Sequence, residues 1–124
     1  MDYIKNTYAE IYIEDGILYF KYLPFENFDI EAAKKIVSER LKLQKEVPFP
    51  VLCDIRQLTL PDIKARRYLA VEGSMLAKAV AYWTDPIGKE YLSQFFISVN
   101  QPPIPTAVFT AKDDAVEYLK AFIE

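Results

Sequence analysis

The chain has 124 residues, of which 52% are hydrophobic and 27% charged, with a formal net charge of -3, one cysteine, three glycines and no histidine. A chain of this length and composition is expected to form one globular domain, residues 1–124. The lack of histidine excludes the Ser–His–Asp and Cys–His sets of common hydrolases. Because Cys53 is also the lone cysteine, an ordinary structural zinc site and a disulfide scaffold are excluded as well.

The composition narrows the class of protein further. The three glycines form neither of the glycine-rich loops that cradle nucleotide phosphates, and the acidic balance argues against nucleic-acid binding. No apolar run approaches the roughly 18 residues that a membrane-spanning helix needs, and the N-terminus does not resemble a signal peptide. We therefore expect a cytoplasmic protein with no metal, no cofactor, no nucleic-acid partner and no membrane span.

The first predicted elements are two strands, residues 8–13 and 17–22, joined by a tight turn at Asp15-Gly16. Placing Asp15-Gly16 at the centre of the turn fixes the register, and a slip by one residue would scramble both faces. One predicted face is apolar, and the other carries an opposite-charge pair. The pairs are Ala9–Tyr22, Ile11–Phe20 and Ile13–Leu18 on the apolar face, and Glu10–Lys21 and Tyr12–Tyr19 on the other.

A first helix is predicted from about Ile30 to Gln44, with Asp29 as its N-cap. Pro48 and Pro50 end this element. Residues 51–54 follow as a short buried strand that contains Cys53 in a core position, and residues 55–61 form a loop. The expected buried stripe of the helix consists of Ala33, Ile36, Val37, Leu41 and Gln44.

The rest of the chain alternates between helices and strands. A second helix begins at Pro61 or Asp62, ends at Gly73 and is expected to place Ile63, Arg67 and Ala70 on one side. Residues 77–83 form a strand, and a third helix starts after Thr84-Asp85 and runs to about Val99. Residues 106–109 form the last strand. Thr110 is expected to cap a final helix whose buried side is Ala115, Val116, Leu119 and Phe122.

The predicted order, β-β-α-β-α-β-α-β-α, indicates an α/β domain with a mostly parallel sheet, right-handed crossovers and an N-terminal antiparallel hairpin. This order resembles the STAS-like fold of bacterial anti-sigma-factor antagonists, and it is similar to small bacterial proteins of that fold with no assigned function. The most specific local match is the strand ending at Asp54, followed by a loop to Asp62 at a helix start. The resemblance spans about residues 8–123 and is carried by residues 50–56, 65–70, 78–81 and 100–106.

The chain departs from the antagonists at their phosphorylation site. In those proteins a phosphorylatable Ser or Thr follows an Asp at the start of this helix, whereas here Asp62 is followed by Ile63, which has no hydroxyl. Ala65 stands where the antagonists have a small glycine, and Thr59 lies three residues too early. The resemblance therefore implies the fold and a binding module, but not the kinase switch.

Polar side chains gather at the carboxyl ends of the predicted strands, where open α/β sheets bind ligands. Asp54 and Arg56, two residues apart, could hold a polar ligand bidentately. The alternative is that these side chains cap their own loops and helices, as such residues commonly do. The candidate ligand or partner rim consists of Asp54, Arg56, Thr59, Asp62, Thr84, Asp85 and Thr110.

Basic residues outnumber acidic ones between residues 32 and 78. This stretch predicts either solvated helix faces or a field that attracts an acidic partner. The basic side chains are Lys34, Lys35, Arg40, Lys42 and Lys45 on the first helix and Lys64, Arg66 and Arg67 on the second.

Aromatic residues are abundant, and the third helix is apolar over a wide arc. That helix is core, a partner interface or the lining of an apolar pocket. Because Tyr8, Tyr12 and Tyr19 also fall on the outer side of the hairpin, we predict a homodimer with Tyr91 and Phe95 at its interface.

Three functions are consistent with these patterns. The first is a non-enzymatic binding or regulatory module of STAS-like fold that takes a protein partner, with no catalytic residue. The second is a carrier or sensor of a small apolar or amphipathic ligand, suggested by the aromatic third helix and Trp83. The third is an enzyme, in which Asp54, Asp62, Asp85 or a tyrosine would have to do the acid–base work, although no spacing singles out a pair.

Overall fold

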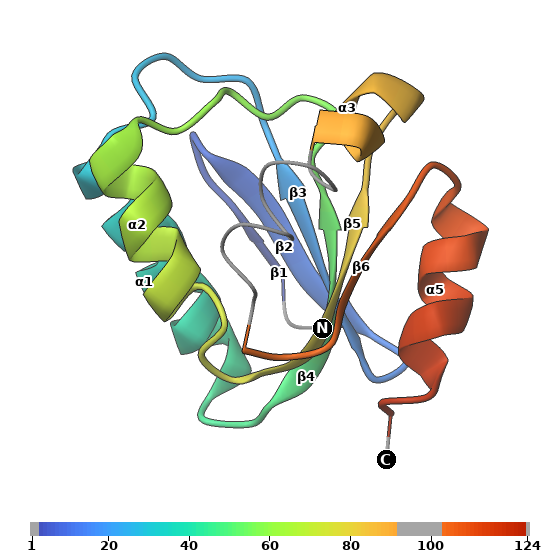
Figure 1. The fold of residues 1–124 in the computed structure, drawn as a ribbon. Coiled ribbons are helices and arrows are strands. Elements are labelled where there is room, and N and C mark those ends of the chain that lie inside the picture. The colour runs from blue at the N-terminus through green and yellow to red at the C-terminus, as the bar shows by residue number, and fades with distance from the viewer. Residues whose placement is uncertain (1–2, 92–102, 124) are drawn as a thin grey trace.

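One six-stranded mixed sheet organises the molecule, with its strands in the order β1-β2-β3-β4-β5-β6 (Figure 1). The computed structural model describes residues 3–91 and 103–123. The strands are β1 Tyr3–Lys5, β2 Ala9–Glu14, β3 Ile17–Tyr22, β4 Phe49–Asp54, β5 Ala77–Trp83 and β6 Thr106–Phe109. The helices are α1 Ile30–Gln44, α2 Ile63–Glu72, α3 Pro86–Tyr91 and α5 Lys112–Lys120.

The β2–β3 hairpin confirms the predicted register at every pair, including Ile11 opposite Phe20 and Glu10 opposite Lys21. Both turn residues have positive φ, 50° at Asp15 and 81° at Gly16. This left-handed backbone is what a two-residue hairpin turn requires, and Asp-Gly adopts it readily. The turn chemistry therefore sets the register of the first half of the sheet.

Strand β1 was not predicted from the sequence. It pairs antiparallel with β2 and contains only three residues, which is too short to show an alternating pattern. Asn6 makes the turn that follows, because its Oδ1 accepts hydrogen bonds from the backbone N–H groups of Tyr8 and Ala9 at 2.8 and 2.9 Å. The sheet therefore opens with three antiparallel strands, and β3 to β6 are parallel.

Helix α1 has the predicted bounds and the predicted cap, since Asp29 Oδ1 accepts a hydrogen bond from the N–H of Ala32 at 2.9 Å. Its buried side is different at the C-terminal end. Arg40 is 5% exposed and belongs to the buried stripe, whereas Leu41 is half-buried. The prediction of a solvated basic face is therefore wrong at Arg40.

The second crossover differs from expectation in two details. Strand β4 starts at Phe49, two residues early, and accommodates Pro50 at a register irregularity next to β5. Helix α2 buries Ala65, while Ile63 and Arg67, which were expected to share one side with Ala70, are exposed. Ala65 faces inward because α2 packs on α1 as well as over the sheet.

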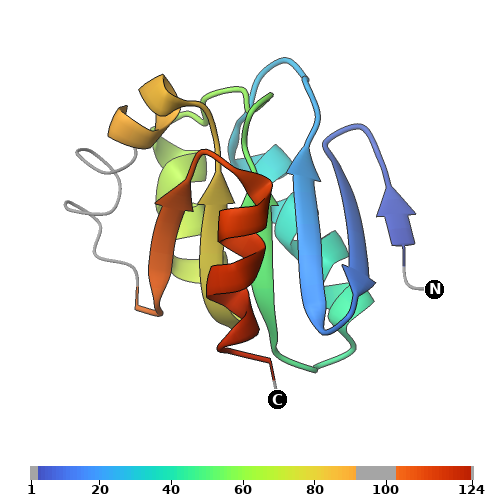
Figure 2. The ribbon, with the colours of Figure 1, turned by 90° about the vertical axis from the view of Figure 1, so that its right-hand side faces the viewer.

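The two faces of the sheet are covered differently. Helices α1 and α2 lie on one face over the larger apolar core, which includes Ile11, Phe20 and Val51. Helix α5 lies on the other face, against β4, β5 and β6, over a smaller core around Leu52 and Leu119 (Figure 2). On this side β1 and β2 have no helix over them in the described part of the chain.

Three further predictions concern Tyr8, Thr110 and the length of the third helix. Tyr8 is not on the outer side of the hairpin with Tyr12 and Tyr19; it packs edge-on against Phe25 at 4.8 Å, beside the larger core. Thr110 does not cap α5, whose N-cap position is Ala111 and has no side-chain hydrogen bond. The predicted continuation of the third helix to Val99, with Phe95, lies outside the described residues, as does the side chain of Tyr91.

Candidate functional site

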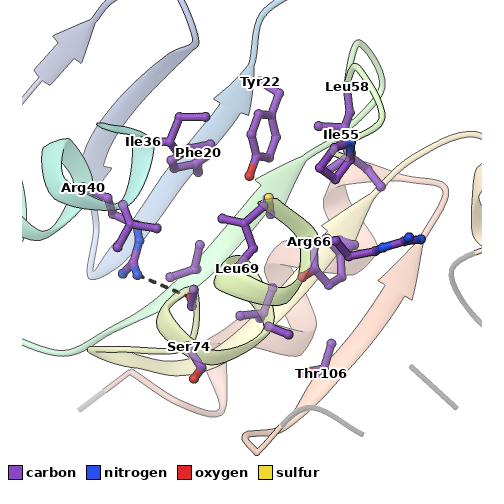
Figure 3. Close-up of a pocket in the computed structure, with 18 of the residues that line it drawn as sticks. Phe20, Tyr22, Ile36, Arg40, Ile55, Leu58, Arg66, Leu69, Ser74 and Thr106 are labelled. Atoms are coloured by element: carbon purple, nitrogen blue, oxygen red, sulfur yellow. Dashed lines mark hydrogen bonds between the residues drawn. The ribbon is translucent and has the colours of Figure 1, made fainter. Parts of the chain in front are cut away.

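A pocket of about 230 Å³ lies between the sheet and the α1–α2 layer (Figure 3). Its floor comes from the sheet residues that face these helices, and its walls come from α1, α2 and the loop after β4. The sheet contributes Phe20, Tyr22, Val51, Cys53, Val80, Tyr82 and Thr106, and the helices contribute Ile36, Val37, Arg40, Arg66, Leu69 and Ala70. Phe28, Ile55, Leu58, Leu60, Pro61, Gly73, Ser74, Pro103 and Ile104 complete the lining.

Most of this lining is aliphatic or aromatic, and its weakly acidic groups keep their protons at neutral pH. Burial raises the pKa of the Cys53 thiol, and the neighbouring Asp54 carboxylate raises it further. Burial is also the main cause that raises the pKa of the Tyr22 and Tyr82 hydroxyls. The thiol and the two phenols therefore offer neutral, weakly polar contacts.

Arg40 is the buried charge of the pocket. Its Nη1 donates hydrogen bonds to Gln44 Oε1 at 2.5 Å and to the carbonyl of Met75 at 2.9 Å, and its Nη2 donates to the carbonyl of Gly73 at 3.3 Å. Gln44 in turn donates to the carbonyls of Val47 and Leu76. These bonds tie the end of α1 to the chain that leaves α2, and they hold the guanidinium at one end of the pocket (Figure 3).

The predicted rim at the carboxyl ends of the strands is mostly occupied by contacts within the protein. Asp54, 5% exposed, accepts hydrogen bonds from Arg56 Nε at 3.0 Å and Arg56 Nη2 at 2.8 Å. Its Oδ1 also accepts from the backbone N–H of Arg56 at 3.1 Å, and the guanidinium lies 3.5 Å from the centroid of the Trp83 ring. Asp54 and Arg56 therefore bind each other. This agrees with the alternative in which Asp54 caps its own loop.

The other rim residues hold the backbone in place. Thr59 donates to the carbonyl of Phe25 at 2.7 Å, Asp62 caps α2, and Asp85 accepts from the N–H of Gly88 at 2.6 Å in the first turn of α3. Thr84 is buried, and Thr110 is exposed. None of the seven rim residues lines the pocket, and their role in ligand or partner binding stays a prediction.

Sequence reasoning missed most of the pocket. The ligand alternative was based on the third helix and on Trp83, yet Trp83 packs under Arg56 and against the smaller core. One pattern could have pointed to the site. Arg40 stands four residues after Ile36 and four before Gln44, on the apolar stripe of α1, and a lone charge on such a stripe is unusual.

Among residues 3–91 and 103–123 no group of three or more histidine, cysteine, aspartate or glutamate side chains is placed to hold a metal ion. Over the same residues, no helix combines the length and the apolar character needed to cross a bilayer.

Comparisons with known proteins agree with this architecture. No curated protein matches the chain. A solved structure from Shewanella loihica PV-4, described as an uncharacterized protein of the DUF3478 family with a SpoIIAA-like fold, is similar with a TM-score of 0.66 and 16% identity. The similarity covers 94% of this chain and 98% of that chain; it establishes the fold alone and confirms the expected STAS-like architecture. The family model described as "Domain of unknown function (DUF7793)" matches residues 11–123, and the chain therefore belongs to that family.

Proposed function

We propose that this protein is a non-enzymatic binding module that holds a small, mainly apolar organic molecule, as a carrier or a sensor. The observation that supports the proposal is the pocket between the sheet and α1–α2, with a volume of about 230 Å³. A cavity of roughly 150 Å³ with apolar walls holds one benzene molecule, so this pocket has room for a ligand of about nine non-hydrogen atoms.

The energetics of packing support an occupant. Protein interiors are close-packed, and side chains around an unfilled space lose dispersion contacts with the atoms that would fill it. The pocket is partly open, since Leu60 and Arg66 of its lining are exposed, and its apolar walls gain little from contact with water. A ligand that fills the pocket restores those contacts, and binding of this kind needs no catalytic group.

A filling substitution tests the proposal. Ala70 lines the pocket, and Ala70→Leu adds an isopropyl group at that position. Ala121→Leu makes the same change at an exposed site after α5 and is the matched control. The probes are benzyl alcohol, benzoate and hexanoate, detected by saturation transfer from protein to ligand in NMR spectra.

We expect at least one probe to receive transfer from the wild-type protein and from Ala121→Leu, and to lose it with Ala70→Leu. Absence of transfer to all three probes in the wild-type protein would overturn the proposal. Equal transfer in wild type and in a folded Ala70→Leu protein would also overturn it, because the probe would then bind elsewhere.

A second candidate function is contact with another protein, for which we propose a second copy of this chain. It is favoured by the tyrosines on the side of the sheet opposite α1 and α2. Tyr12 stacks on Tyr19 at 4.9 Å between ring centroids, and Tyr3 stacks on Tyr12 at 6.4 Å. Tyr3 is 47% exposed at the edge of the sheet.

The cytoplasmic location expected from the sequence stays a prediction.

A further inference from the structure

The charges that line the pocket all have one sign. Two arginines, Arg40 and Arg66, belong to the lining, and among the described residues that line the pocket none is an aspartate or a glutamate. The whole chain has a net charge of -3, so its overall composition does not explain this bias. Arg66 is exposed on α2, whereas Arg40 is 5% exposed and lies at the far end of the pocket from it (Figure 3).

Arg40 has no counter-charge in the described part of the chain. Its hydrogen-bond acceptors are the Gln44 amide and the carbonyls of Gly73 and Met75, which are neutral. Within residues 3–91 and 103–123, the ion pairs join other residues and none involves Arg40. Asp54, which is buried to the same extent, does have such a partner in Arg56.

A buried charge of this kind is costly unless an opposite charge offsets it. A guanidinium cannot escape by losing its proton at physiological pH, although burial lowers the pKa of Arg40. The neighbouring groups cannot supply the opposite charge, because the pKa values of Cys53 and Tyr22 are raised by burial and both remain neutral. A bound anion would supply the counter-charge that these neighbours do not.

We propose that the ligand of this pocket is a small organic anion with an apolar body, whose carboxylate pairs with Arg40. The inference rests on the proposed function and adds the chemical class of the ligand. The apolar body packs against the aliphatic and aromatic lining, which includes Val51, Leu69 and Val80. Arg66, the exposed cation of the lining, adds attraction for an approaching anion.

The test compares ligands that differ in charge and hardly at all in shape. Benzoate and benzamide have the same number of non-hydrogen atoms, and so do hexanoate and hexanamide. Benzoate and hexanoate are ionised at pH 7, since carboxyl pKa values lie near 4, whereas the amides are neutral. Dissociation constants are measured for the wild-type protein by isothermal titration calorimetry.

We expect each carboxylate to bind about tenfold or more tightly than its amide, because hydrogen bonds to charged groups are the stronger kind. Equal affinity of acid and amide would overturn this inference and leave the proposed function standing. If neither member of either pair binds, and benzyl alcohol does not bind either, both the inference and the proposed function fail.

Three variants assign the preference to its residues. Arg40→Gln should bring the ratio of acid to amide affinity close to one, and Arg66→Gln should lower the association rate of the acid and its affinity slightly. Arg67→Gln removes a neighbouring exposed charge of α2 outside this pocket and should leave the ratio unchanged. A folded Arg40→Gln protein that keeps the full preference would overturn the assignment to Arg40. If Arg40→Gln does not fold, the wild-type acid–amide comparison decides the ligand class.

Discussion

Arg40 and Asp54 are both 5% exposed, and the protein satisfies the two charges in different ways. The Asp54 carboxylate receives a bidentate pair of hydrogen bonds from Arg56, whose pKa this contact raises. Arg40 donates its hydrogen bonds only to neutral acceptors within the described residues. Asp54 and Arg56 therefore form a closed structural pair, whereas Arg40 has no acidic partner among the described residues.

The protonation of Cys53 predicts how stability changes with pH. The ordinary pKa is 9.0 for a cysteine thiol and 10.0 for a tyrosine phenol. In the folded state burial raises the pKa of both Cys53 and Tyr82. Above pH 9 the unfolded chain releases protons that the folded chain keeps, so the free energy of unfolding falls as pH rises. Below pH 9 these groups are protonated in both states and cause no pH dependence.

Urea unfolding followed by circular dichroism between pH 7 and pH 11 measures this effect. The contribution of these groups should leave the urea concentration at the unfolding midpoint unchanged up to about pH 9 and lower it above that pH. In Cys53→Ala the decline should begin nearer pH 10, where the tyrosines titrate. The interpretation would be wrong if the wild-type and Cys53→Ala curves kept the same shape.

Helix caps give a prediction at the scale of the elements. Asp29 caps α1 through a 2.9 Å hydrogen bond from the N–H of Ala32, so Asp29→Ala should lower the free energy of unfolding by about 1 kcal/mol. Thr110 precedes α5 without capping it, and Thr110→Ala should change stability by less than about 0.5 kcal/mol. Denaturant unfolding of the two variants distinguishes them. A larger loss for Thr110→Ala would mean that its hydroxyl does cap the helix.

The elements were largely predictable because local chemistry decided them. Asp15-Gly16 set the hairpin register, Asp29 and Asp62 set two helix starts, and the strand over residues 77–83 has the predicted bounds. Where local chemistry was weak, prediction failed. Strand β1 is stabilised by pairing with β2 rather than by its own three residues, and the buried side of α2 depends on contacts with α1.

The site was much less predictable than the elements. Cys53 was correctly placed in the core, yet nothing local shows that a space remains beside it. The pocket combines residues from β3, β4, β5, α1 and α2, so it exists only after these elements have packed. The polar residues that the sequence favoured are mostly engaged in capping and pairing, which satisfies them locally.

The unequal covering of the sheet gives a prediction for the whole molecule. Helix α5 packs on β4, β5 and β6, and in the described part of the chain no helix covers this side of β1 and β2 (Figure 2). These two strands carry Tyr3 and Tyr12. If a second copy covers Tyr3 and Tyr12, light scattering should give a mass near twice 14.4 kDa at micromolar concentration. Tyr12→Lys should then return the mass to 14.4 kDa without unfolding the domain. A wild-type mass of 14.4 kDa would contradict the dimer.

The binding pocket is the central claim, and methyl NMR of the protein titrated with benzoate tests it most directly. The larger core supplies Val51, Leu69 and Val80 as reporters that line the pocket, and the smaller core supplies Leu52 and Leu119 as internal controls. We predict saturable shifts of the three pocket methyl groups with little change at the two controls. Absence of saturable shifts at Val51, Leu69 and Val80, or equal shifts in both cores, would contradict the account.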